Sequence, residues 1–102
     1  MELKDTVKLM NSSDYQDRFK AEYFQLTNRI KGLSTMTDKY ARGTLNFTPK
    51  CDLKLLDNQL RVMLDYRNHL IERAKIEGID LNEYVEESTV DKTNNILEGE
   101  DE

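Results

Sequence analysis

Apolar residues recur along residues 14–41 with the spacing of one helical face. Phe19, Leu26, Leu33 and Tyr40 recur every seven residues, and Tyr23 and Ile30 fill intermediate positions of the same face. Such a repeat gathers side chains on one stripe of an α-helix. Ser13 and Gln16 have capping-box spacing, and Gly43 stands where a left-handed cap is expected. The pattern predicts a long helix over 14–41.

A second stripe follows residues 43–51, where Pro49 bars a continuous helix. Its apolar members keep helical spacing and are Leu53, Leu56, Leu60, Met63, Leu70 and Ala74. Asp52 is the expected N-cap, and Gly78 is expected to end the helix. Ile79 or Leu81 can then fold back as the apolar contact of that cap.

The predicted fold class is all-α. Two long antiparallel helices, each roughly 40 Å long at 1.5 Å per residue, form a helical hairpin after a short helical lead-in over 5–10. One helix–helix interface buries too little apolar area to offset the chain entropy lost on folding. Several apolar residues also lie off the shared stripe: Phe24, Met36, Leu55, Leu64, Ile71 and Ile76. We therefore expect a compact homo-oligomer; alternatively, these are scattered surface apolar residues, which are common.

Charge divides the chain into two predicted parts. Residues 82–102 hold eight acids and one base, a net charge of −7 within a total of −5, so residues 1–81 carry +2. We expect a hairpin domain over 1–81 and an acidic, disordered tail over 82–102. A mildly basic body without a clustered basic stripe argues against binding of a DNA or RNA polymer.

Other classes of function find little support. No apolar run approaches the ~18 residues needed to cross a bilayer, so no membrane partner is expected. Cys51 is the single cysteine and His69 the single histidine, so neither a disulfide nor a histidine metal cluster is expected. The four glycines are isolated, which excludes a phosphate-binding glycine loop. We expect a cytosolic protein that is not an enzyme and needs no cofactor.

Tyr15 and Arg29 are candidate ligand-binding residues on the first helix. They are 14 residues apart, so they share a side but are separated by about 21 Å. Antiparallel first helices of two chains could bring the ring of one to the cation of the other. A ring can stack on a base and a guanidinium can bind a phosphate. The alternative is that Tyr15 covers the core and Arg29 is solvated.

Arg67 and Arg73 raise a similar question on the second helix. Arg67 occupies a stripe position that would otherwise be apolar, and Arg73 shares a face with Tyr66. Second helices that met around a symmetry axis would place a ring of arginines there, able to hold several phosphates. The alternative is surface arginines paired with acids such as Asp65 or Glu72.

Two stretches carry a resemblance to a known family. "YQDRF" at 15–19 followed by "LTNRIKGL" at 26–33, and "QLRVMLDYRNHLIER" at 59–73, resemble the helices of phage anti-CBASS sponges. These proteins sequester cyclic oligonucleotide signals, and larger sponges that counter Thoeris defence share their hairpin. The resemblance covers roughly residues 14–77 and does not extend to the acidic tail.

The resemblance implies a hexamer in the host cytoplasm that captures its ligands without cleaving them. Cyclic dinucleotides would lie between two protomers, with Tyr15 matching the stacking ring and Arg29 the basic contact. Arg29 stands where relatives carry lysine, which keeps the charge but alters the donor geometry. Cyclic trinucleotides would bind on threefold axes, where Arg73 is the match and Glu77 a weaker one. The competing readings are an oligomeric adaptor that binds another protein and, less favoured, a nucleic-acid-binding hairpin.

Overall fold

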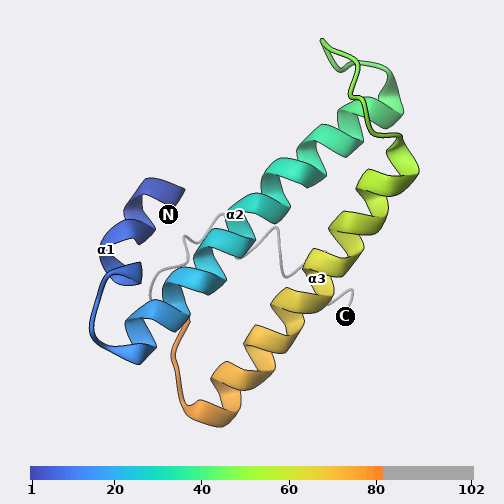
Figure 1. The fold of residues 1–102 in the computed structure, drawn as a ribbon. Coiled ribbons are helices and arrows are strands. Elements are labelled where there is room, and N and C mark those ends of the chain that lie inside the picture. The colour runs from blue at the N-terminus through green and yellow to red at the C-terminus, as the bar shows by residue number, and fades with distance from the viewer. Residues whose placement is uncertain (82–102) are drawn as a thin grey trace.

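The computed structural model describes residues 1–81 and is helical throughout its regular parts. A 3₁₀ turn, η1 (Leu3–Thr6), runs into the short α1 (Val7–Met10), and two long helices follow, α2 (Tyr15–Arg42) and α3 (Leu53–Glu77). Figure 1 shows α2 and α3 packed side by side as an antiparallel pair. The predicted all-α hairpin with a helical lead-in is confirmed. The tail predicted over 82–102 lies outside the described residues.

The ends of α2 are fixed by side-chain and glycine caps. Asp14, not Ser13, is the N-cap, and its carboxylate accepts a hydrogen bond from the backbone N–H of Gln16 at 2.9 Å. Ser13 therefore does not form the predicted capping box, because the helix begins one residue later than that motif requires. At the other end Gly43 adopts φ 73°, the left-handed conformation that glycine takes without a steric penalty.

The ends of α3 agree with the sequence pattern. Asp52 is the N-cap and accepts from the backbone N–H of Leu55 at 2.8 Å. Gly78 ends the helix with φ 73°, and the chain then turns back so that Ile79 is buried in the core. Leu81 packs against the same cluster, as predicted for the apolar contact of the cap.

One apolar core joins the two long helices. Its buried members are Phe19, Leu26, Ile30, Leu70, Ala74 and Ile79, and Tyr23, Leu60, Met63 and Leu64 pack against it. All of these residues except Leu64, which was expected off the stripe, come from the two predicted stripes and from the predicted return after Gly78. The core lies nearer the end of the hairpin where α2 begins and α3 ends. Apolar packing between the two helices is therefore concentrated at that end.

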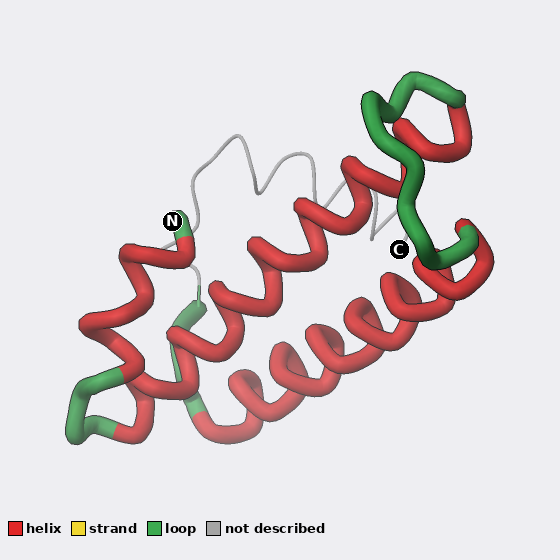
Figure 2. Tube along the Cα trace, turned by 45° about the horizontal axis from the view of Figure 1, so that its top comes forward, coloured by secondary structure: helices red, strands yellow, loops and turns green. Residues whose placement is uncertain are grey.

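The lead-in packs on α2 through polar contacts. Thr6 is fully buried; its hydroxyl donates to the carbonyl of Leu3 at 2.7 Å and accepts from Gln25 Nε2 at 2.9 Å. Asn28 Nδ2 donates to the carbonyl oxygen of Met1 at 2.5 Å. In Figures 1 and 2 the lead-in lies on one side of α2 and α3 on another. The lead-in thus covers a face of α2 that α3 leaves uncovered.

The apolar residues off the stripe have mixed environments. Phe24 is buried, and Met36, Leu64 and Ile71 are partly covered. Leu55 and Ile76 are exposed, as are Val62 and Tyr66 on the same helix. None of the helices in residues 1–81 is long and apolar enough to cross a membrane.

Candidate functional site

Three of the four candidate site residues meet at one end of the hairpin. The antiparallel packing brings the first residue of α2, Tyr15, beside the last turns of α3, where Arg73 and Glu77 lie one turn apart. Arg73 Nη2 donates to the Tyr15 hydroxyl at 2.7 Å, and that hydroxyl donates to Glu77 Oε1 at 2.9 Å. Arg73 Nε also donates to Glu77 Oε2, at 3.3 Å. Each side chain therefore contacts the other two, and we call this set the Tyr15–Arg73–Glu77 triad.

The ring of Phe19 packs against two members of the triad, Arg73 and Tyr15. The Arg73 guanidinium carbon lies 5.0 Å from the centroid of the Phe19 ring, within the range of a cation–π contact. The rings of Tyr15 and Phe19 meet edge to face with centroids 6.1 Å apart. Because Phe19 is itself buried in the core, it gives the arginine and the tyrosine a fixed platform.

The contacts within the triad alter its protonation equilibria. The hydrogen bond to the Glu77 carboxylate is the main reason why the pKa of Tyr15 is raised above its ordinary value, so the phenol keeps its proton. Partial desolvation lowers the pKa of Arg73, but its contacts with Tyr15 and Glu77 outweigh this, and the net direction is upward. At neutral pH the triad holds a neutral phenol beside a permanent cation.

The triad is accessible from solvent. Tyr15 is 46% exposed, and the side chains of Arg73 and Glu77 are 50% and 33% exposed. An incoming molecule can therefore reach the tyrosine ring and the guanidinium together. A ring beside a cation is an arrangement that can hold a base and a phosphate.

Arg29 is not part of this cluster within one chain. It lies in the middle of α2, is exposed, and makes no hydrogen bond or ion pair among residues 1–81. The helical rise puts it about 21 Å from Tyr15, as the sequence spacing predicts. The two residues could thus contact one small ligand only if they came from different chains.

Arg67 differs from the surface arginine that one reading of the sequence allowed. It is only 4% exposed, and its Nε atom is buried without a hydrogen-bond partner among residues 1–81. The alternative of a solvated Arg67 paired with an acid is wrong, because Arg67 follows the apolar stripe of α3 into the packed side of the helix. Arg73 does form an acid pair, but with Glu77 rather than with Asp65 or Glu72.

The sequence reading missed the contribution of Phe19 and the direct contact between Tyr15 and Arg73. The apolar spacing predicts only a packing role for Phe19, and the family resemblance assigns Tyr15 and Arg73 to different ligands. A register estimate could have found both: if Tyr15 opposes Glu77 in an antiparallel pair, Phe19 opposes Arg73 one turn further along. Nothing in the spacing within either helix contains that information.

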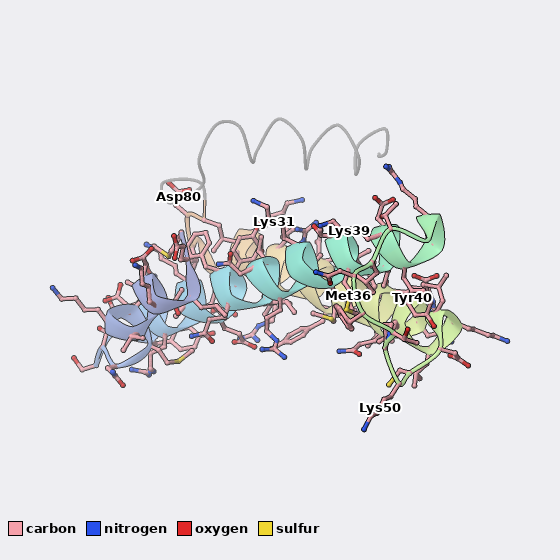
Figure 3. The ribbon with its side chains drawn as sticks, turned by 90° about the horizontal axis from the view of Figure 1, so that it is seen from above. Lys31, Met36, Lys39, Tyr40, Lys50 and Asp80 are labelled. Atoms are coloured by element: carbon pink, nitrogen blue, oxygen red, sulfur yellow. The ribbon has the colours of Figure 1, made fainter. Side chains whose placement is uncertain are left out.

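The other polar side chains of residues 1–81 lie apart from the triad. Residues 1–81 contain no group of His, Cys, Asp and Glu side chains that could hold a metal ion. His69 is exposed, and its Nδ1 lies 2.9 Å from the backbone carbonyl oxygen of Asp65. In Figure 3, Lys31 and Lys50 project from opposite edges of the molecule, so these two cations do not share one surface.

Comparison with known proteins gives one match. No curated protein and no solved structure matches the chain. A family model named Sequestin matches residues 13–76, which include α2 and nearly all of α3. The name indicates that members of the family sequester a molecule. Because the match spans more than half of the sequence and most of the helical hairpin, the chain belongs to the Sequestin family.

Proposed function

We propose that this protein is a phage anti-defence protein that captures cyclic oligonucleotide second messengers in the host cytoplasm. It would block CBASS-type immune signalling by holding the messenger without cleaving it. Family membership supports sequestration of a molecule. The observation that carries the proposal is the exposed side chain of Tyr15, whose hydroxyl accepts a hydrogen bond from the exposed guanidinium of Arg73. That pair offers a stacking surface for a base and a charge-assisted donor for a phosphate.

Cyclic dinucleotides would bind between two copies of the chain. Tyr15 of one copy would stack on a base, and Arg29 of the second copy would contact a phosphate. The exposure of Arg29 and its lack of a partner among residues 1–81 support this role, because its donors are available. Antiparallel packing of two α2 helices would bridge the distance that separates the two residues within one chain.

Cyclic trinucleotides would bind where α3 helices meet around a threefold axis, with Arg73 from each copy. A hexamer of hairpins would contain both kinds of site. Exposed apolar residues on α3 support such an assembly. Leu55, Val62 and Tyr66 recur at seven and four residues, which gives them one face of the helix, and we call them the outer stripe of α3. Their burial between copies would stabilise the oligomer.

Calorimetric titration with a panel of cyclic di- and trinucleotides tests the proposal. We expect tight binding of at least one cyclic dinucleotide. A cyclic trinucleotide should also bind, with a different number of ligands per protein chain. Ligand released by heat denaturation should be chemically intact, because the proposed function is capture alone and residues 1–81 contain no group of His, Cys, Asp and Glu that could hold a hydrolytic metal ion. Recovery of linearised nucleotide would identify the protein as an enzyme instead.

The second candidate is an oligomeric adaptor that binds another protein through its surface. The exposure of Ile76, at 84%, favours it, because a large apolar side chain at the end of α3 is uncovered within the chain. A thermal-shift screen with cyclic nucleotides distinguishes the two functions. A ligand that binds only the folded state raises the unfolding midpoint, whereas an adaptor would show no shift with any nucleotide.

A further inference from the structure

Glu77 occupies the side of Arg73 that a phosphate would use. A guanidinium binds an oxyanion best along an edge that offers two parallel N–H donors. In the triad, Arg73 Nε donates to Glu77 Oε2 at 3.3 Å, while the other carboxylate oxygen of Glu77 accepts from Tyr15. The second donor in use, Arg73 Nη2, is directed to the Tyr15 hydroxyl. Both donors of that edge are thus engaged inside the protein.

We propose that Glu77 is a built-in competitor for Arg73, displaced when a phosphate-bearing ligand binds. This inference rests on the proposed function in that it takes a phosphate-bearing nucleotide as the ligand of Arg73. It gives Glu77 a different role from that of a ligand contact. The Glu77 carboxylate holds the guanidinium in place in the free protein and leaves it when a stronger anion arrives.

The exposure of the pair makes displacement feasible. The side chains of Arg73 and Glu77 are 50% and 33% exposed, so solvent already reaches the contact and the released carboxylate can be hydrated. An ion pair this exposed contributes little to stability, so the competition it imposes is modest. A buried pair would have cost far more to separate, since it would leave an unpaired charge out of water.

Competition of this kind gives selectivity. A ligand that offers only one phosphate gains a contact with Arg73 but loses the contact that Glu77 makes, so its net gain is small. A cyclic trinucleotide on the proposed threefold axis presents a phosphate to Arg73 of each copy, and its further contacts with the protein add affinity that Glu77 cannot offset. Cyclic nucleotides are favoured over small inorganic anions.

Neutralisation of Glu77 in the full chain tests the inference. Glu77→Gln removes the competing charge and keeps the size of the side chain. Glu72→Gln is the matched control, because Glu72 lies on the same helix, is exposed, and pairs with Lys75 at 3.5 Å. Two probes are titrated by calorimetry: the cyclic nucleotide panel, and inorganic pyrophosphate, which has the charge without the base. We expect Glu77→Gln to tighten binding of pyrophosphate and of Arg73-dependent nucleotides by roughly two- to five-fold, the range for a partly exposed ion pair.

The control separates competition from a general change of charge. An equal gain with Glu72→Gln would overturn the inference, because both variants remove one negative charge. Weaker nucleotide binding by Glu77→Gln would also overturn it and would make Glu77 a ligand contact. So would an unchanged affinity for both probes. If no cyclic nucleotide binds any variant but the pyrophosphate gain is specific to Glu77→Gln and is abolished by a further Arg73→Gln change, the proposed function fails while the competitor role of Glu77 stands.

Discussion

Arg73 Nη2 donates a hydrogen bond to the Tyr15 hydroxyl at 2.7 Å, although 58 residues separate the two along the chain. This contact joins residues that the family resemblance assigns to different ligands, Tyr15 to cyclic dinucleotides and Arg73 to cyclic trinucleotides. Removal of the tyrosine therefore also removes a hydrogen-bond partner of the arginine. Substitutions at Arg29 and Arg73, which do not contact each other within one chain, separate the two proposed sites more cleanly.

Arg29→Ala is expected to weaken cyclic dinucleotide binding at least ten-fold and to leave cyclic trinucleotide binding unchanged. The reason is the loss of a charge-assisted phosphate contact, for which about 1.5–3 kcal/mol is typical. Arg73→Ala should have the opposite selectivity. Lys31→Ala is the control, since it removes an exposed cation two residues from Arg29 on the same helix. Loss of both ligands with either arginine variant, while the assembly persists, would show that there is only one site.

Tyr15→Ala and Tyr15→Phe distinguish the ring from the hydroxyl. The alanine variant loses a stacking partner, which costs ~1–3 kcal/mol for a base on an aromatic ring, so dinucleotide affinity should fall ten-fold or more. The phenylalanine variant keeps the ring and loses both hydrogen bonds of the hydroxyl, to Arg73 and to Glu77. We expect it to retain dinucleotide binding within a few-fold. Equal losses in the two variants, measured by calorimetry, would mean that the hydroxyl rather than the ring carries recognition.

The pH dependence of stability should reveal the triad. The folded chain raises the pKa of Tyr15, mainly through the hydrogen bond to Glu77, so the folded state favours the protonated phenol. The resulting stability is fully present below the unfolded pKa near 10 and is lost as the pH rises through the higher folded value. Denaturant unfolding at a series of pH values should therefore give a steeper loss of stability above about pH 10 for the wild type than for Tyr15→Phe. Parallel curves would contradict the contact with Glu77.

Substitutions at Arg67 test whether its buried side chain stabilises the fold through apolar packing or through its charge. Its side chain is buried, and its Nε lacks a partner among residues 1–81, so an apolar residue of similar length should be tolerated. We expect Arg67→Met to match or exceed the wild type in free energy of unfolding. Arg67→Ala should cost about 2 kcal/mol or more, because the buried methylene groups of the side chain are lost as well. A large loss with methionine would mean that the guanidinium makes a necessary polar contact in the assembled protein.

The outer stripe of α3 is the proposed surface between copies. Val62→Asp places a charge on this stripe, where Val62 is 58% exposed in the single chain. Light scattering after size exclusion should then show dissociation from the proposed hexamer. Asn68→Asp is the control: it introduces the same charge at an exposed position about 120° around the helix. A wild-type species of 12.0 kDa at micromolar concentration would contradict both the assembly and the intersubunit site.

The two long helices and most of their ends follow from local features of the amino-acid sequence. The seven-residue recurrence of apolar positions is a local property of a helix, so it gave the two long helices and the sides on which they pack. Gly43 and Gly78 both adopt φ 73° at the ends of α2 and α3, and Asp52 caps α3, because capping depends on a few neighbouring residues. The N-cap of α2 is Asp14 rather than the predicted Ser13, since adjacent residues can both act as caps, and the other helix ends differ from the prediction by no more than two residues.

The pairing of side chains between the two helices depends on the packing of the whole hairpin. The register between α2 and α3 is set by how the side chains of both stripes interlock and by the length of the connection, and neither helix encodes it alone. That register brings Tyr15 and Phe19 to Arg73 and Glu77, and it turns Arg67 into the packed side of α3. Arg29 remained where the helical rise alone put it, exposed in the middle of α2, because its position depends on one helix.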